Sequence, residues 1–309
     1  MTIRTRRRFL AQAGRYAVAA LLAHGRPGAL RAAPLGEPVG IQLYAVKDEL
    51  QADPAATLRA IREIGFGEVE TAGFAGRSAQ QFRRLLDDAG LACPSAHLQF
   101  DPDNLGAAFE QAHALGAHYA TSGSLRALVL AAHGEPQRSP AAPPAMSPDE
   151  AKRTAALANH IGEQARRAGL QYAYHNHDFE FADQGDGAIG YDLLLKDTDP
   201  GLVHFEIDCG WMVVGGRDPR DYFRRHPQRF PMIHVKDFLP PAPPGRPAGT
   251  LTPHPGAELG HGMIDYGPIF AAAEKAGLKH YFAEQEGPFT RMSQLEAARQ
   301  AYAYLRKLS

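Results

Sequence analysis

Short runs of β-branched and aromatic residues alternate with longer stretches rich in Ala, Leu and Arg from residue 38 onward. The short runs are typical of buried strands and the longer stretches of helices. We count eight such pairs. The predicted strands are Val39–Tyr44, Glu68–Thr71, Ala92–Leu98, Tyr119–Ser122, Gln171–His175, Val203–Asp208, Met232–Val235 and His280–Glu284. The predicted helices lie around 52–64, 78–90, 104–115, 148–169, 189–196, 218–226, 265–276 and 291–307.

This strict order of strand and helix predicts an α/β fold with parallel strands and right-handed crossovers. Eight units close a (β/α)8 TIM barrel, which typically takes about 250 residues, so we expect a single barrel domain over 34–309. A doubly wound open sheet is the alternative, but no glycine-rich phosphate loop follows the first strand. The Pro-rich stretches 134–147 and 239–257 are predicted loops on the face that carries a barrel's active site.

The N-terminal segment has the composition of a targeting signal. Its residues Thr5-Arg6-Arg7-Arg8-Phe9-Leu10 resemble a twin-arginine export signal, and the Ala-rich stretch that follows is too short to span a bilayer. We therefore expect residues 1–33 to be a signal peptide and the protein to be periplasmic or secreted, without a stable membrane anchor. A solvated basic tail with a short amphipathic helix is the alternative.

The net charge bears on nucleic-acid binding, and the cysteine content bears on disulfide formation. Hydrophobic residues make up 44% of the 309 positions, enough to bury a sizeable core. Residues 1–33 hold seven arginines and no acids, which leaves the rest of the chain with a net charge of −8. A body this acidic does not attract nucleic acid. Cys93 and Cys209 either pair in an oxidising compartment or remain buried thiols, and their spacing leaves both possible.

Ionisable residues gather at the carboxyl ends of the predicted strands. Residues i and i+2 of a strand share a face, so each pair can point into the barrel. Barrel interiors are ordinarily filled with Val, Ile and Leu, and buried charges there need a partner or a metal. The strand-end segments are Glu68-Val69-Glu70, Ser95-Ala96-His97, Tyr174-His175-Asn176-His177, Glu206-Ile207-Asp208, His234-Val235-Lys236-Asp237 and Glu284-Gln285-Glu286.

Asp208, His234 and Glu284, with one histidine of the fifth strand, form a mixed nitrogen and oxygen set. Such a set suits a divalent ion such as Mn, Zn, Co or Fe. Taken singly, each residue also has an ordinary structural explanation: a hydrogen-bonded interior histidine, a turn aspartate and a salt-bridge glutamate. Because the three residues fall at three successive strand ends, a shared metal site is favoured over three separate structural roles.

At these residues the chain resembles the xylose-isomerase-like barrels, which include sugar phosphate isomerases and epimerases, inosose dehydratases and relatives. The resemblance implies one divalent ion (Mn, Co, Zn, Fe or Mg) held by Glu, Asp, His and Glu from strands five to eight. The last three fall on Asp208, His234 and Glu284, and the first falls on His175. The segments that carry the resemblance are Gly40–Tyr44, Gly67–Glu70, Tyr174–Phe181, Phe205–Trp211, Ile233–Asp237, Leu259–Asp265 and Ala283–Gln285.

Two positions depart from the family pattern. His175 replaces a glutamate, and Trp211 stands where sugar epimerases often carry a histidine. A simple two-glutamate epimerisation is therefore not expected. The resemblance still implies a shared first step, in which the metal polarises a carbonyl, a base removes the α-proton and an enediolate forms. His175 or His177 is the predicted base, and Glu284 competes with them.

Other strand-end residues have predicted roles around the substrate. Lys236 could hold the enediolate or leaving oxygen, or form a buried ion pair with Glu206. Trp211 offers an apolar surface to a sugar ring or packs under the loop 239–257. His254 and His261 are predicted either to be exposed to solvent or to lie behind the residues that contact the substrate directly. The predicted substrate contacts are Glu70, His97, Glu206, Trp211 and Gln285.

The predicted substrate is an unphosphorylated sugar, keto-sugar or cyclitol, because neither a phosphate loop nor an arginine cluster is evident and the protein is expected to be exported. The leading hypothesis is a metal-dependent isomerase or epimerase. The runner-up is a metal-dependent lyase acting on a 3-keto-glycoside or an inosose. A carbohydrate-binding barrel without turnover is third. A homo-oligomer is compatible with the sequence.

Overall fold

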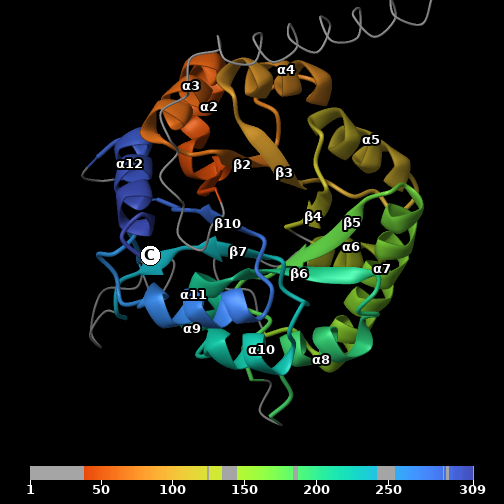
Figure 1. Cartoon of the computed structure of the whole chain (residues 1–309). Coiled ribbons are helices and arrows are strands. Elements are labelled where there is room, and N and C mark those ends of the chain that lie inside the picture. Colours follow the sequence, from red (N-terminus) through yellow and green to blue (C-terminus); the bar gives the residue numbers. More distant parts are fainter. Residues whose placement is uncertain are drawn as a thin grey trace, which may run out of the picture.

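Eight parallel strands close into a barrel in the computed structural model, which describes residues 38–123, 125–133, 145–183, 187–241, 255–287, 289 and 292–308. Around the barrel the strands follow the order β1-β10-β7-β6-β5-β4-β3-β2 (Figure 1). The predicted barrel is confirmed. Its strands are β1 (Gly40–Gln42), β2 (Glu68–Ala72), β3 (Ala92–His97), β4 (Tyr119–Ser122), β5 (Gln171–His175), β6 (Val203–Asp208), β7 (Met232–Val235) and β10 (His280–Ala283).

The predicted signal, 1–33, lies outside the described residues, as do most of the two long loops, 134–147 and 239–257. The predicted helices are found, with bounds that shift by a few residues. The helices are α2 (Lys47–Ala52), α3 (Pro54–Ile64), α4 (Ala79–Ala89), α5 (Leu105–Leu115), α6 (Leu125–Ala132), α7 (Pro148–Arg167), α8 (Gly190–Asp197), α9 (Cys209–Val214), α10 (Pro219–Arg225), α11 (Tyr266–Lys275) and α12 (Gln294–Leu305).

Local side-chain chemistry sets where the elements begin and end. Ser78, Ser147 and Ser293 each cap a helix and complete a capping box with the residue three positions later. The first strand is shorter than predicted, because the Gln42 side chain accepts a hydrogen bond from the Tyr44 amide and turns the chain into the 3-10 helix η2 (Leu43–Val46). Side chains thus terminate the strand before its apolar run ends.

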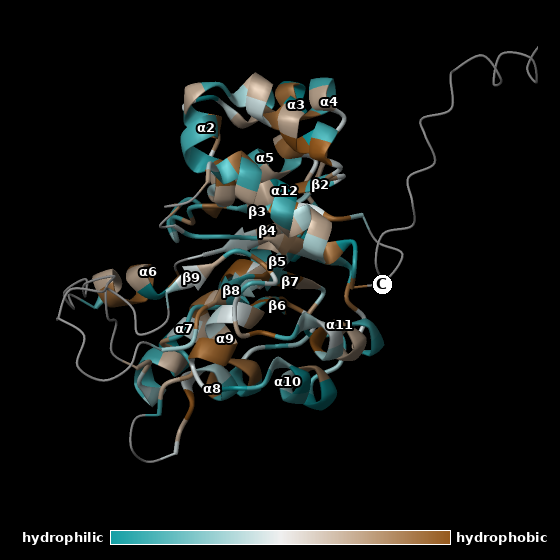
Figure 2. Ribbon diagram, turned by 90° about the vertical axis from the view of Figure 1, so that its left-hand side faces the viewer, coloured by the Kyte–Doolittle hydropathy of each residue, from teal (hydrophilic) through white to brown (hydrophobic). Residues whose placement is uncertain are grey.

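The core has two layers. Apolar side chains fill the space between the strands and the outer helices, whose residues range from hydrophilic to hydrophobic in Figure 2. Inside the barrel, Tyr119, Ala173, Met232 and Phe282 form a small apolar cluster. This floor leaves the carboxyl-end half of the interior to polar side chains. None of the described helices is both long and apolar enough to cross a bilayer.

A small hairpin follows the seventh barrel strand. It pairs β8 (Asp237–Phe238) with β9 (Gly256–Ala257) in antiparallel fashion. The buried Asp237 carboxylate accepts hydrogen bonds from the amides of Phe238, Gly260, Gly262 and Ile264. One side chain therefore ties the returning segment to the end of β7.

The loop after β5 is held by a buried glutamate. Glu180 accepts a hydrogen bond from the Tyr174 hydroxyl at 2.8 Å and from the His177 amide at 3.0 Å. Burial disfavours the charged carboxylate and raises the pKa of Glu180 to about 8. The two cysteines, Cys93 and Cys209, are free and buried, so they do not form a disulfide.

Replacing Gly162 by Ala tests the contact between α7 and the strand layer. The added methyl would collide with the backbone carbonyl and the Cβ of Leu202. We expect a loss of about 1–3 kcal/mol in the free energy of unfolding, the usual cost of overpacking. Gly106→Ala, on the exposed face of α5 with no close neighbour, is the control and should cost nothing. Equal stability of the two variants in urea denaturation would contradict the packing.

Replacing Glu180 by Gln tests the protonation of the buried glutamate. A glutamate in the unfolded chain titrates at about 4.3, whereas the pKa of Glu180 in the folded protein is about 8. Between these values only the folded state binds the proton, so the contribution of Glu180 to stability falls as pH rises.

Glutamine does not titrate, and we therefore expect the Tm of Glu180→Gln minus that of the wild type to increase from pH 5 to pH 8.5. The exposed Glu274→Gln is the matched control, with a Tm difference that should not change with pH. A pH-independent difference for Glu180→Gln would show that the carboxyl is ionised in the fold.

Candidate active site

Seven ionisable side chains from five strands and one strand end converge in the polar half of the barrel. They are almost fully buried, apart from His97, whose side chain is 18% exposed. The donor atoms of six of them, all but Glu70, fall into two groups that share His234. The seven residues are Glu70 (β2), His97 (β3), His175 (β5), Glu206 and Asp208 (β6), His234 (β7) and Glu284 (after β10).

Asp208, His234 and Glu284 form the group nearer the strand ends, here called the outer group. Each offers one ligand atom, and these atoms lie within 4.8 Å of one another. Asp208 is opposite His234 in the β6–β7 register, and His234 Nδ1 lies 2.9 Å from Glu284 Oε2. Three of the four predicted metal ligands are thus brought together.

Glu70 fixes the orientation of the His234 ring. His234 Nε2 lies 2.6 Å from Glu70 Oε2, so this nitrogen donates its proton to the carboxylate. Nδ1 lies 2.9 Å from Glu284 Oε2, and a cation bound between Asp208 and Glu284 would replace the proton on this nitrogen. A histidine that binds a metal is commonly held by such a carboxylate on its other nitrogen. The outer group therefore fits a divalent cation in both its donors and their support.

Glu70 is itself enclosed. Its carboxylate accepts hydrogen bonds from Gln42 Nε2 at 2.9 Å and from the Ser95 hydroxyl. Burial alone would raise the pKa of Glu70, but the neighbouring His97 and His234 outweigh it and hold the pKa well below its usual range. The residue is completely buried. Its contacts favour support of His234 over the predicted contact with substrate.

His175, the fourth predicted ligand, belongs to the other group. In the β5–β6 register it faces Glu206, and its Nδ1 lies 3.0 Å from Glu206 Oε2. Asp208 lies two residues further along β6. The Asn176 side chain donates a hydrogen bond to the backbone carbonyl of Asp208 and accepts one from its backbone amide. The strand stagger thus separates His175 from the outer group.

Lys236 lies beside the outer group. Its Nζ is 2.9 Å from Glu284 Oε2, 3.1 Å from Asp208 Oδ2 and 2.6 Å from Glu286 Oε1. Burial alone would lower the pKa of Lys236, but the three carboxylates outweigh it and raise the pKa well above its usual value.

The predicted pair of Lys236 with Glu206 is wrong. Glu206 pairs with histidines instead, whereas Lys236, two residues beyond His234, reaches carboxylates nearer the strand ends. Glu286 was not among the predicted site residues. Its position two residues after Glu284 is the signal that could have found it.

Aromatic rings line one side of the group. Lys236 Nζ lies 4.9 Å from the Trp211 ring, and Trp211 packs against Phe238 and His177 with ring centroids 4.8 and 6.3 Å apart. Burial and the charge of Lys236 lower the pKa of His177 to about 4, so its imidazole is neutral near pH 7. Within the described residues His177 accepts no hydrogen bond on its ring.

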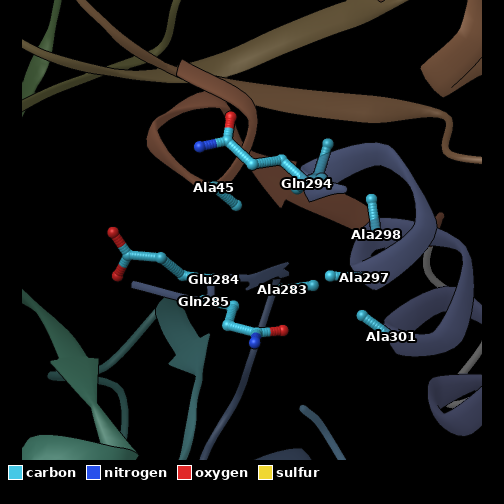
Figure 3. Close-up of a pocket in the computed structure, with 9 residues that line it drawn as sticks. Ala45, Ala283, Glu284, Gln285, Gln294, Ala297, Ala298 and Ala301 are labelled. Atoms are coloured by element: carbon cyan, nitrogen blue, oxygen red, sulfur yellow. The ribbon is translucent and has the colours of Figure 1, made fainter. Parts of the chain in front are cut away.

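The remaining predicted contacts are distributed as follows. Gln285 points away from the Glu284 carboxylate and lines a small cavity between β10 and α12 (Figure 3). It therefore lies outside the barrel interior. His97 Nε2 lies 2.8 Å from Glu206 Oε2. His261 is exposed, and His254 lies outside the described residues.

Comparison with known proteins identifies the family to which this fold belongs. The family profile described as xylose isomerase-like TIM barrel matches residues 58–308. An inosose dehydratase of Lacticaseibacillus casei is 30% identical over 172 residues, covering 52% of this chain and 56% of that protein. The chain thus spans about half the length of the curated relatives it matches.

Solved structures match over more of the chain. A sugar phosphate isomerase/epimerase from Parabacteroides distasonis is 25% identical with a TM-score of 0.68, covering 91% of this chain and 97% of that one. A xylose isomerase-like barrel from Mycobacterium smegmatis in complex with magnesium is 19% identical with a TM-score of 0.61, covering 88% and 96%. The chain belongs to the xylose isomerase-like TIM barrel family.

Proposed function

We propose that this barrel is a metal-dependent enzyme that removes a proton from the carbon beside a carbonyl group of an unphosphorylated keto-sugar or keto-cyclitol. The observation that carries the proposal is the position of Lys236 at 2.9 Å from Glu284 and 3.1 Å from Asp208, within the outer group. A proton donor and two acidic ligands are thereby combined at one point of the interior.

Asp208, His234 and Glu284 would hold the divalent cation. Their nitrogen and oxygen donors suit Mn, Co, Zn or Fe, and Mg is the ion named for one solved relative. When bound, the cation would draw electron density from the substrate carbonyl and make the adjacent C–H bond more acidic.

His177 is the proposed base. It is neutral, half-buried, and packed against Trp211 close enough to Lys236 to be influenced by its charge. The α-proton moves to a ring nitrogen of His177, and the electron pair of the broken C–H bond is delocalised toward the carbonyl oxygen. His175 is less suited, because Nδ1 is occupied by Glu206 and the side chain is almost buried.

Lys236 is the proposed acid, and its presence favours elimination. After the α-proton leaves, the bond from the β-carbon to its oxygen breaks, and that oxygen takes a proton from Lys236 Nζ. The products are an unsaturated ketone and water or an alcohol. This assignment would make the protein a lyase, and two curated relatives named inosose dehydratase support it.

An isomerase or epimerase is the second candidate, supported by the Parabacteroides distasonis relative that covers almost the whole barrel. In this case the first proton transfer is the same, but no oxygen leaves. Glu284 or Lys236 would return a proton to the neighbouring carbon or to the opposite face. A carbohydrate-binding barrel without turnover is the third candidate.

Charge supports a substrate without phosphate. Glu70, Glu206, Asp208 and Glu284 are buried around the site. Lys236 is the one lysine or arginine found to pair with any of these carboxylates in the described part of the chain. Lys236 is already engaged by three carboxylates, which leaves it less available to a phosphate dianion. Trp211 offers an apolar face to a sugar or cyclitol ring, and export by the predicted signal would favour the same substrate class.

Hydrogen exchange tests the proposal. The purified protein, loaded with Mn²⁺ and mixed with keto-sugars and inososes in deuterated water, should replace a substrate C–H by C–D. Asp208→Asn should lose both the cation of the outer group and the exchange. A product that absorbs in the ultraviolet and is lighter by the lost water or alcohol identifies the lyase, whereas unchanged mass identifies the isomerase. Absence of exchange across the panel would overturn the proposal in favour of a binding protein.

Substituting His177 and Lys236 separates base from acid. We expect His177→Gln to slow exchange by about 10²–10⁴-fold, the usual contribution of a general base. Lys236→Gln should retain exchange but release the unsaturated product more slowly by a comparable factor. Lys275→Gln, exposed on α11, is the control and should match the wild type. Loss of both activities in Lys236→Gln, with the fold intact by circular dichroism, would argue against its role as the acid.

A further inference from the structure

Beyond the proposed function, we infer that the barrel binds a second divalent cation, held by His97, His175 and Glu206 beside the outer group. These three residues are here called the inner site. They come from β3, β5 and β6, and their donor atoms, with one from His234, lie within 4.8 Å of one another.

Imidazole nitrogens surround a single oxygen of the inner site. Glu206 Oε2 lies 2.8 Å from His97 Nε2, 3.0 Å from His175 Nδ1 and 3.2 Å from His234 Nε2. Ligands on a tetrahedral cation with bonds of about 2.0 Å are about 3.3 Å apart. An outward shift of a few tenths of an ångström would therefore turn this cluster into a coordination shell.

The hydrogen bonds of the inner site fall on one carboxylate oxygen of Glu206 and leave the other without a partner. His97 and His175 occupy both lone pairs of Glu206 Oε2, since the third nearby nitrogen, His234 Nε2, donates to Glu70. Glu206 Oε1 is buried and has no hydrogen-bond partner among the described residues. Buried carboxylate oxygens are normally satisfied. A cation that takes Oε2 or both oxygens would remove this imbalance.

The charge of the buried carboxylates also favours a cation at the inner site. Glu70 and Glu206 are completely buried, and neither pairs with a lysine or arginine within the described ranges. Two carboxylates in a dry interior require positive charge close by. A divalent cation bound by His97, His175 and Glu206 would supply that charge in place of the protons that the histidines otherwise provide, and Glu70 Oε2, 3.2 Å from His97 Nε2, is near enough to share it.

The two sites can be filled at the same time. His234 would serve the outer group through Nδ1, while its Nε2 donates to Glu70 at 2.6 Å. The inner site then keeps two imidazoles and a carboxylate as its own ligands. Such a nitrogen-rich set selects Zn²⁺, Co²⁺ or Fe²⁺ over Mg²⁺ and Ca²⁺, which prefer oxygen.

Metal counting tests this inference. The purified protein is dialysed against excess Zn²⁺, freed of loosely bound ion, and analysed by mass spectrometry of the elements. We expect two Zn²⁺ per chain in the wild type, and one in His97→Asn and in Glu206→Gln. Asp208→Asn should also retain one, that of the inner site. His261→Asn, an exposed histidine, is the control and should retain two.

Titration of the metal-free wild type with Co²⁺ gives a second measurement that needs no variant. Visible absorption should increase until two equivalents have been added. Saturation at one equivalent, or two Zn²⁺ in both His97→Asn and Glu206→Gln, would overturn the inner site. Failure of the proposed function is a separate result: Asp208→Asn would then keep its exchange activity, whatever the metal count of the inner-site variants.

Discussion

Four carboxylates in the closed interior of the barrel impose the main constraint on this structure. Glu70, Glu206, Asp208 and Glu284 are almost or completely removed from water, where an unpaired charge would cost several kcal/mol. Each is therefore matched with an imidazole or with an ammonium group. The histidines and Lys236 on neighbouring strands follow from this need, and the barrel is the scaffold that brings them within reach.

The fold could be predicted because its signals are local and repeated. The barrel strands are short runs that alternate with helices, and this order determines how the strands pair. The features that the sequence did not reveal are a few short helices and the end of the first strand. The sequence pattern did not separate α2 from α3, and it did not show α6 or α9. The early end of β1 depends on one hydrogen bond from the Tyr44 amide to the Gln42 side chain.

The candidate site could be predicted only in part, for a geometric reason. Alternation along a strand shows which side chains point inward, so Asp208, His234 and Glu284 could be grouped. The height of each strand relative to its neighbour is a property of the closed barrel. This stagger pairs His175 with Glu206, and places Lys236 with Asp208, Glu284 and Glu286. No pattern within one strand carries that information.

The histidine at position 175 follows from the same constraint. Its neighbour across the β5–β6 register is Glu206, which is completely buried. A glutamate at 175, which the family pattern implies, would set two carboxylates side by side in low dielectric, and one would have to take up a proton. Histidine offers Nδ1 to Glu206 instead. The change thus removes an acid from one end of the site, which argues against a mechanism with two opposed glutamates and favours the proposed use of His177 and Lys236.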